Sequence, residues 1–140
     1  MARPESGPRA VLERFRQAAI DQSVEAMTEL YAEDAVHEFP FSRPGLPTRL
    51  EGRDRIVEFI TAGWRSGVLR YESYRTLAIH DTLDPDTIVV EQEAVGTSTV
   101  SGAVALPNVV VLTVSDGRIR IFRDYVNILA AAEATGITIG

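Results

Sequence analysis

The sequence predicts an α+β fold in a single domain that spans residues 1–140. Helical periodicity is confined to the first half of the chain and to a short C-terminal segment, whereas residues 69–127 alternate as long strands do. Helices first and strands afterwards differ from the regular βαβ order of parallel α/β folds. A length of 140 residues also suits one domain with its own core.

The N-terminal part of the chain predicts a loose arm, residues 1–8, followed by two helices. Apolar side chains recur at three- and four-residue spacing from Val11 onward, with charged residues between them. Pro8 suits the first turn of this helix, where its missing N–H is not needed. Ser23 can cap a second, shorter helix that runs through Tyr31.

The middle of the chain predicts one strand, one loop and one more helix. Residues 34–41 are expected to form a strand that Pro40 ends or confines to a sheet edge. Residues 42–50 contain two prolines and a glycine, which favours an ordered loop or lid. Residues 53–66 carry apolar side chains on one side of a third helix.

The second half of the chain predicts a meander and a short Ala-rich terminal helix. The Asp116-Gly117 pair is a strong signal for a type I′ hairpin. In the first strand of the meander, strict alternation would place Leu69, Tyr71, Leu77 and Ile79 on one face. The four expected strands cover residues 69–80, 87–99, 103–115 and 118–127.

Composition excludes several classes of chemistry and of partner. The chain has no Cys, which removes disulfides and thiolate sites, and all of its 14 basic residues are Arg, which removes Schiff-base lysine catalysis. A net charge of −6 argues against nucleic-acid and anionic-membrane surfaces. No apolar run has the length of a membrane span. We therefore expect a cytoplasmic protein with no nucleic-acid or membrane partner.

The residues that could carry chemistry lie on the predicted strands. Glu91, Glu93 and Val95 share one strand face, and Phe122 and Asp124 share another. Alternation alone does not say which face points inward. Two interpretations of the glutamates stay open: a solvated sheet face paired with the arginines of the last strand, or the wall of a pocket.

Histidine supplies the remaining candidate for acid–base or metal chemistry. His37 is either a structural histidine or a pocket group, and nothing in its local pattern decides between the two. His80 is predicted on a different strand, without the spacing of a metal-ligand pair. No metal site is expected. No Gly-rich phosphate loop is present either, so no cofactor is expected.

Three segments together resemble a known family. They are Leu30-Tyr-Ala-Glu-Asp-Ala-Val-His-Glu-Phe-Pro40, Glu51-Gly-Arg-Asp-Arg-Ile56 and Asp116-Gly-Arg-Ile-Arg-Ile-Phe-Arg-Asp-Tyr-Val-Asn127. Their order and spacing resemble the SnoaL-like, ketosteroid-isomerase-like branch of the nuclear transport factor 2-like superfamily. The resemblance implies a cone, in which a curved mixed sheet wraps around helices and encloses an apolar pocket. It also implies a homodimer paired through the outer sheet face.

Only some of the catalytic residues of these enzymes have a counterpart in this sequence. Phe39 stands where ketosteroid isomerases have their base, although His37 could point into the same pocket. Asp124 matches one catalytic carboxylate of limonene-type epoxide hydrolases, and Glu93 matches the other. Glu91 stands where those enzymes have the bridging Arg, so the triad is incomplete. Fold similarity alone therefore does not define the reaction.

If the strands present the same faces to the pocket as in this family, Glu91, Glu93, Asp124 and His37 would all point inward. The expected function is a cofactor-independent enzyme that cyclises, isomerises or opens an epoxide in an apolar, oxygenated small molecule. Asp124 would be the base, Glu93 the acid, and Glu91 and His37 tuning or proton-relay groups. The alternative is a non-catalytic small-molecule-binding or dimeric interaction module. The expected substrate-binding residues are Tyr31, Phe39, Phe41, Trp64, Val95, Asn108 and Phe122.

Overall fold

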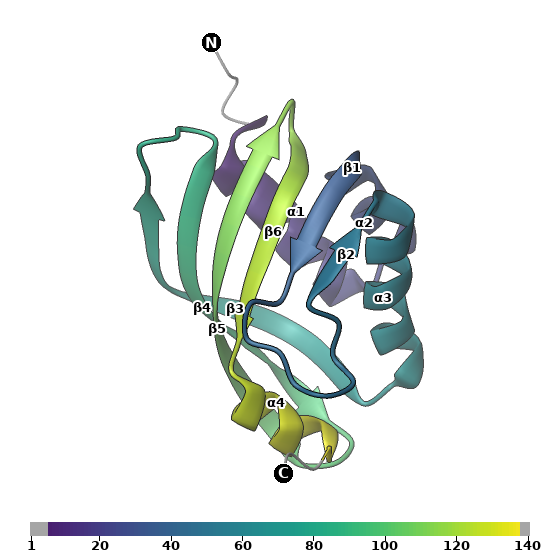
Figure 1. Ribbon diagram of the computed structural model, residues 1–140. Helices are drawn as coiled ribbons and strands as arrows, with labels where there is room; N and C mark the ends of the chain where they lie inside the picture. Colours follow the sequence, from purple (N-terminus) through teal and green to yellow (C-terminus); the bar gives the residue numbers. More distant parts are fainter. Residues whose placement is uncertain (1–5, 138–140) are drawn as a thin grey trace.

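Six strands form one mixed sheet, and the helices lie against one of its faces (Figure 1). The structure is a computed structural model that describes residues 6–137, so most of the predicted N-terminal arm lies outside the described residues. The sheet order is β2-β1-β6-β5-β4-β3. The elements are α1 (Pro8–Asp21), α2 (Val24–Leu30), β1 (Tyr31–Glu38), β2 (Arg49–Glu51), α3 (Arg53–Ser66), β3 (Leu69–Asp81), β4 (Thr87–Ser98), β5 (Gly102–Ser115), β6 (Arg118–Val126) and α4 (Ile128–Thr135).

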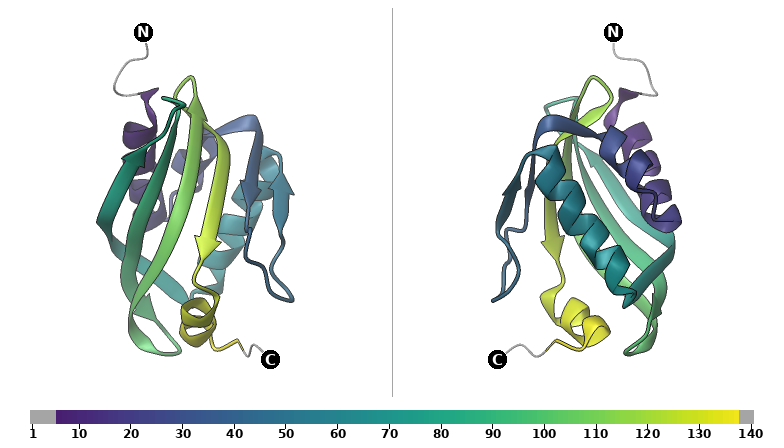
Figure 2. Two further views of the ribbon diagram at one scale, coloured as in Figure 1. Left: turned by 60° about the vertical axis from the view of Figure 1, so that its left-hand side comes forward. Right: turned by 90° about the vertical axis from the view of Figure 1, so that its right-hand side faces the viewer.

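The sheet is strongly curved and open, and α1 and α3 cover its concave face (Figure 2). The strand pair β1–β6 is parallel, whereas all other neighbours are antiparallel. The opposite, outer face of β4, β5 and β6 carries no helix in these views. This arrangement confirms the predicted α+β cone. No helix in the described part of the chain is long and apolar enough to span a membrane.

Local sequence signals explain the helices and the last hairpin. The hydroxyl oxygen of Ser23 accepts a hydrogen bond from the Ala26 amide at 3.1 Å, as expected for the cap of α2. Val11 of α1 is completely buried. In the β5–β6 turn, Asp116 and Gly117 have φ angles of 53° and 75°, which is the pattern of a type I′ turn.

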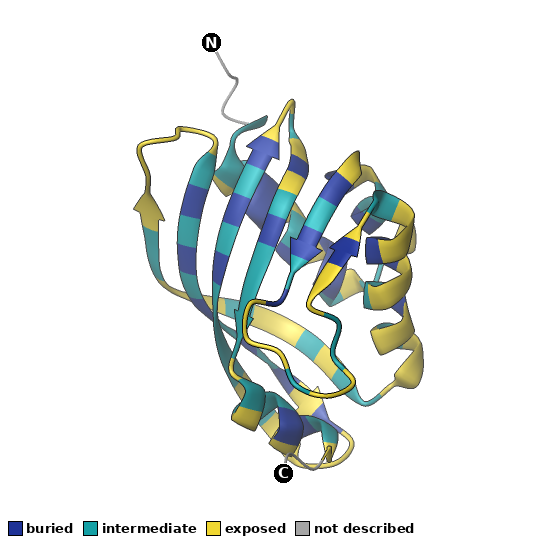
Figure 3. Cartoon of the chain, viewed as in Figure 1, coloured by how far each residue is buried: buried dark blue, intermediate teal, exposed yellow. Residues whose placement is uncertain are grey.

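The core lies between the helices and the concave face of the sheet. Figure 3 shows buried and half-buried residues alternating along β4 and along the second half of β5, because successive side chains point to opposite faces. The inward side chains of these strands pack with those of α1, α2 and α3. The largest completely buried side chains are Tyr31, Leu12, Met27, Ile56, Ile88, Leu112 and Ile119.

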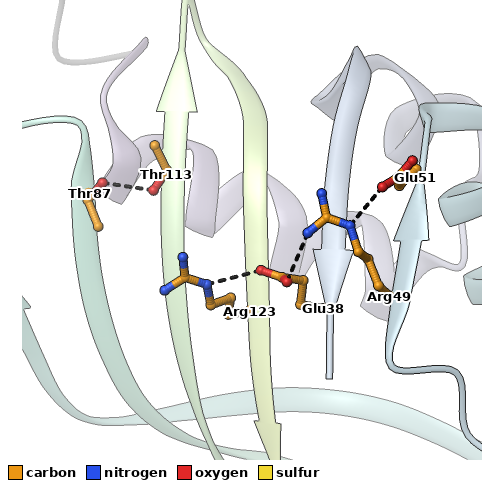
Figure 4. A network of polar contacts seen from close by, with 6 residues as sticks. All are labelled: Glu38, Arg49, Glu51, Thr87, Thr113 and Arg123. Carbon is orange, nitrogen blue, oxygen red and sulfur yellow. Dashed lines mark hydrogen bonds and ion pairs between the residues drawn. The ribbon is translucent and has the colours of Figure 1, made fainter. Parts of the chain in front are cut away.

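The outer face of β1, β2 and β6 is held by an ionic ladder (Figure 4). Glu38 accepts hydrogen bonds from Nη1 of Arg49 and from Nε of Arg123, each at 3.1 Å. Glu38 and Arg123 are register partners on β1 and β6. Their immediate neighbours, His37 and Asp124, therefore point to the concave face.

The structure differs from the predicted elements at three places. β1 begins at Tyr31 rather than at residue 34, directly after α2, and it ends before Pro40. The predicted loop over residues 42–50 contains the start of β2, which pairs with β1. β3 is bulged at two points, between Tyr71 and Ser73 and between Thr76 and Ala78, so its two-residue alternation is broken.

Gly96 allows the first of these bulges to pack against β4. A Cβ atom built on Gly96 would lie 2.0 Å from the carbonyl oxygen of Arg70 and 2.9 Å from the Cα atom of Tyr71. No side chain fits at such a distance from backbone atoms. Glycine is therefore required at this position by close backbone approach.

Candidate functional site

A cavity of about 580 Å³ lies between the concave face of the sheet and the helices. Its size suits a small organic ligand, since such sites typically measure roughly 300–1,000 Å³. Most of its wall is aromatic or aliphatic. Its lining includes Phe15, Met27, His37, Phe39, Phe59, Ile60, Trp64, Tyr71, Tyr74, Gln92, Ala94, Leu106, Asn108, Phe122, Asp124, Val126 and Ala131.

Asp124 is the one acid among the described residues that line this cavity. It lies on β6 between Phe122 and Val126, which share its inward face. Burial raises the pKa of Asp124 from 3.8 to about 6, because the apolar wall disfavours the charged form. A side-chain hydrogen bond from Asn108 opposes part of that shift. At neutral pH the group is therefore a carboxylate that accepts a proton more readily than an exposed aspartate.

Asn108 positions the carboxylate from the neighbouring strand. Its Nδ2 donates to Oδ1 of Asp124 at 2.8 Å. Asn108 lies on β5 directly opposite Gln92 of β4 and Val126 of β6. Its own Oδ1 is buried and has no hydrogen-bond partner within the described residues. The amide therefore acts at this site as a donor to Asp124.

His37 is a neutral, buried member of the cavity wall. Its ring stacks on Phe122, with centroids 4.5 Å apart, and also contacts Phe39. Desolvation lowers the pKa of His37 from 6.5 to about 3, so the imidazole is uncharged at neutral pH.

The hydrogen bond between His37 and Tyr31 determines the histidine tautomer. The hydroxyl of Tyr31 lies 3.2 Å from Nδ1 of His37, and Tyr31 is completely buried. Since this is the hydroxyl's single partner in residues 6–137, its proton is satisfied only if it donates to Nδ1. The imidazole proton then resides on Nε2. His37 is therefore a hydrogen-bond donor through Nε2.

Two tyrosines that are not among the predicted substrate-binding residues also line the cavity. Tyr71 and Tyr74 of β3 both face inward and meet edge to face at 5.9 Å. They are three residues apart, and the bulge between Tyr71 and Ser73 brings them to the same side. Burial raises the pKa of Tyr71 to about 12 and that of Tyr74 further, so both keep their phenolic protons. A bulge leaves no clear signal in the sequence.

The structure corrects the predicted position of Glu91 and Glu93. Both lie on the outer face of β4 and neither lines the cavity. Glu93 is paired with Arg75 of β3, and Glu91 lies beside His80 of the same strand. The inward face of β4 carries uncharged residues instead, because the sheet curves around the helices on that side. The two glutamates lie on the outer face, as in the first interpretation, but their partners belong to β3 rather than to the last strand.

The predicted substrate-binding residues divide in the same way. Phe39, Trp64, Asn108 and Phe122 line the cavity, together with Asp124 and His37. The remaining three do not, and each has a different physical reason. Val95 shares the outer face of β4 with the glutamates, Phe41 lies beyond the end of β1 with 58% of its surface exposed, and Tyr31 is buried behind His37.

Gln92 and Arg16 form a further polar pair that the sequence did not reveal. Gln92 is an inward residue of β4 that lines the cavity, and Arg16 of α1 is buried with only 6% of its surface exposed. Arg16 donates to the side-chain oxygen of Gln92 from Nε and Nη2, at 3.1 and 2.7 Å. An arginine within an amphipathic helix is normally exposed, so nothing in the local pattern distinguished it.

No group of three His, Cys, Asp or Glu side chains that could hold a metal ion occurs within residues 6–137. The arrangement is that of an apolar chamber with one carboxylate and several neutral hydrogen-bond donors. Such a chamber can bind an apolar molecule with a few oxygen atoms and move a proton within it.

Solved structures share this architecture. A proposed isomerase from Bacillus subtilis superimposes with a TM-score of 0.87 at 28% sequence identity, covering 99% of each chain. A limonene-epoxide-hydrolase-like (LEH-like) epoxide hydrolase of Mycobacterium tuberculosis superimposes with a TM-score of 0.65 at 18% identity, covering 89% of this chain and 86% of its own. The second similarity is one of fold alone.

Sequence comparison identifies the family. A PhzA/B-like protein of Pseudomonas aeruginosa is 34% identical over 109 residues, which is 77% of this chain and 75% of that protein. The family model of the SnoaL-like domain matches residues 12–122. The chain therefore belongs to the SnoaL-like domain family.

Proposed function

We propose that this protein is a cofactor-independent enzyme in which Asp124 is the general base. The observation that carries the proposal is the burial of this carboxylate in an apolar cavity with a pKa of about 6. A base whose pKa lies near neutrality accepts a proton readily while remaining mostly ionised at pH 7. Its amide partner Asn108 keeps one oxygen occupied and leaves the other for substrate.

The proposed reaction is an isomerisation or cyclisation that begins with proton abstraction from carbon. Asp124 removes the proton, and the neutral donors of the cavity stabilise the resulting anion. The donors that line the cavity include Nε2 of His37 and the hydroxyls of Tyr71 and Tyr74. The apolar wall excludes water and strengthens these interactions. Asp124 then returns the proton at another position.

Epoxide opening is less well supported by the same chamber. That reaction requires an acid to protonate the leaving oxygen while a base activates water. Because Glu91 and Glu93 lie on the outer face, no second carboxylate from β4 is available to serve as that acid. We therefore propose proton transfer at carbon as the main activity.

The proposed substrate is an apolar small molecule that carries oxygen. The cavity volume of about 580 Å³ accommodates a molecule with two or three fused rings. Rings from Phe39, Trp64 and Phe122 offer flat apolar surfaces to it. The small number of polar groups favours a ligand with few charges of its own.

Proton exchange tests the proposal without knowledge of the natural substrate. Apolar cyclic ketones are incubated with the enzyme in deuterated water, and NMR measures deuterium uptake at carbon. We expect the wild-type chain to accelerate exchange and Asp124→Asn to lose at least about 100-fold of that acceleration. Glu93→Gln is the matched control, since its side chain lies on the outer face.

The exchange assay also decides between the catalytic and the binding interpretation. Equal exchange by wild type and Asp124→Asn would contradict the role of Asp124. Ketones that bind in the cavity without any exchange would instead support the non-catalytic binding module of this fold.

We also propose that two copies pair through the outer face of β4, β5 and β6. This face is not covered by helices, and it carries half-buried apolar side chains such as Val109 and Val111. Beside them lies the ion pair of Glu93 and Arg75, which provides one negative and one positive side chain. In a two-fold dimer, the negative group of one copy can therefore face the positive group of the other. Light scattering after size exclusion tests this: Val111→Arg should yield monomers, whereas Leu83→Arg, in the exposed β3–β4 turn, should not. A monomeric wild type would contradict the proposal.

A further inference from the structure

A buried arginine organises the wall of the cavity opposite Asp124. Arg16 of α1 bonds Gln92 through two nitrogen atoms, and its Nη1 donates to the hydroxyl oxygen of Thr76 at 2.8 Å. Its guanidinium also lies 5.5 Å above the ring of Tyr74. The one carboxylate paired with it is Glu13, whose side chain is 68% exposed. The positive charge of Arg16 is therefore only weakly compensated.

This contact determines the orientation of the Gln92 amide. Both hydrogen bonds from Arg16 go to Oε1, and an arginine has no acceptor to offer the amide nitrogen. Nε2 must therefore point elsewhere. It has no hydrogen-bond partner among residues 6–137, and it is not one of the fully enclosed unpaired atoms of the described chain. Because Gln92 lines the cavity, its N–H groups are available to a ligand there.

The hydroxyl of Tyr74 lies on the same wall. Tyr74 also lines the cavity, keeps its phenolic proton and has no hydrogen bond from that hydroxyl to the described residues. The guanidinium of Arg16 packs on its ring and so holds it beside Gln92. Arg16 thus contacts two side chains that present free donors to the cavity.

The spacing between these donors and Asp124 follows from the strand order. Gln92 of β4 is the register partner of Asn108 of β5, and Asn108 bonds Asp124 of β6. Neighbouring strands are about 4.8 Å apart, and Asp124 lies two residues along β6 from Val126, the register partner of Asn108, so the backbones of Gln92 and Asp124 are separated by about 12 Å. On a concave face their side chains converge. A ring system can therefore reach the carboxylate with one edge and the donors with the other.

We propose that Gln92 and Tyr74, positioned by Arg16, form the oxyanion site of this enzyme, and that the substrate is a carbonyl compound with an acidic C–H. The inference rests on the proposed function, because it takes Asp124 as the base. Asp124 accepts the proton of the C–H bond, and that electron pair moves through the conjugated system onto the carbonyl oxygen. The enolate oxygen is bound by Nε2 of Gln92 and the hydroxyl of Tyr74. Protonated Asp124 then delivers its proton to a different carbon, and the carbonyl forms again.

Arg16 is a positioning residue in this scheme. It strengthens the amide of Gln92 as a donor, because a charge-assisted bond to Oε1 polarises the whole group. It also places a positive charge behind the oxygen on which negative charge develops.

Two probes of equal shape test the site directly. 2-Naphthol carries a hydroxyl oxygen of the enol type and naphthalene lacks it, and fluorescence titration gives the affinity of each. We expect the wild-type chain to prefer 2-naphthol, and Gln92→Met to reduce the ratio of the two affinities about 10-fold. Arg16→Met should reduce the same ratio. General structural damage would weaken both probes and leave the ratio unchanged.

Asp124→Asn separates this inference from the proposed function. If the preference for 2-naphthol survives in Asp124→Asn and is lost in Gln92→Met, the oxyanion site is supported whatever the exchange assay shows. If Gln92→Met keeps the wild-type ratio, the oxyanion assignment is wrong, even where Asp124→Asn abolishes exchange. An equal affinity of the wild type for both probes would also overturn it.

Discussion

The side-chain amide of Asn108 donates to the carboxylate of Asp124 at 2.8 Å, across the β5–β6 pair and inside the cavity. This bond favours the charged form of Asp124, whereas burial disfavours it, and burial has the larger effect. The acid therefore titrates near the pH at which a general base is most useful.

Removing the amide should raise the pKa of Asp124. Asn108→Leu keeps the side-chain shape but loses the donor, so the pKa should move from about 6 toward higher values. Carbon-13 NMR of the Asp124 carboxyl group measures the shift. Glu93→Gln should leave it unchanged, because Glu93 lies on the outer face. A pKa that falls or stays constant in Asn108→Leu would contradict this account of the site.

The buried carboxylate should cost stability at neutral and alkaline pH. The pKa of Asp124 is higher in the folded than in the unfolded chain, so its contribution to stability is lost as pH rises from 3.8 through about 6. Asp124→Asn should raise the free energy of unfolding by about 3 kcal/mol at pH 8 and by less than about 1 kcal/mol near pH 4. Urea unfolding at both pH values measures the difference. A gain that is equal at the two values would refute the linkage.

Tyr31 and His37 should behave as a coupled pair. His37→Phe leaves the hydroxyl of Tyr31 buried without an acceptor, at a cost of about 1–3 kcal/mol. Adding Tyr31→Phe removes that hydroxyl, so the double variant should recover part of the loss. A double-mutant cycle at pH 7, followed by urea unfolding, gives the coupling energy. Strictly additive effects would show that the hydrogen bond does not contribute.

Two glycines should respond oppositely to alanine. Gly96→Ala forces a methyl group against the carbonyl of Arg70, so it should destabilise the chain by about 3 kcal/mol or more. Gly63 lies inside α3, and no atom lies within 4 Å of the place that an alanine methyl would occupy, so Gly63→Ala should stabilise the chain by about 0.5–1 kcal/mol. Thermal unfolding compares both. Tolerance of alanine at Gly96 would mean that the β3 bulge can shift.

Most of the fold and part of the site could be predicted from the sequence. Local signals were sufficient for α1, for the Ser23 cap and for the Asp116-Gly117 turn, because each depends on a few neighbouring residues. The inward position of Asp124 was predicted from the family resemblance and the alternation of β6. By contrast, the same resemblance placed Glu91 and Glu93 inside, where the structure has Gln92.

The sequence by itself determined the order of the elements, except for the short strand β2, and the kinds of chemistry that are possible, because periodicity, turn residues and composition are local properties. Only the tertiary structure decided which side chains share the cavity. Alternation along a strand fixes which side chains share a face, but either face could point inward until the helices pack on one of them, as β4 shows. Bulges in β3 brought Tyr71 and Tyr74 to one side, and packing of α1 on the sheet brought Arg16 to Gln92 across 76 positions of the chain. Such contacts depend on long-range packing, which no local pattern encodes.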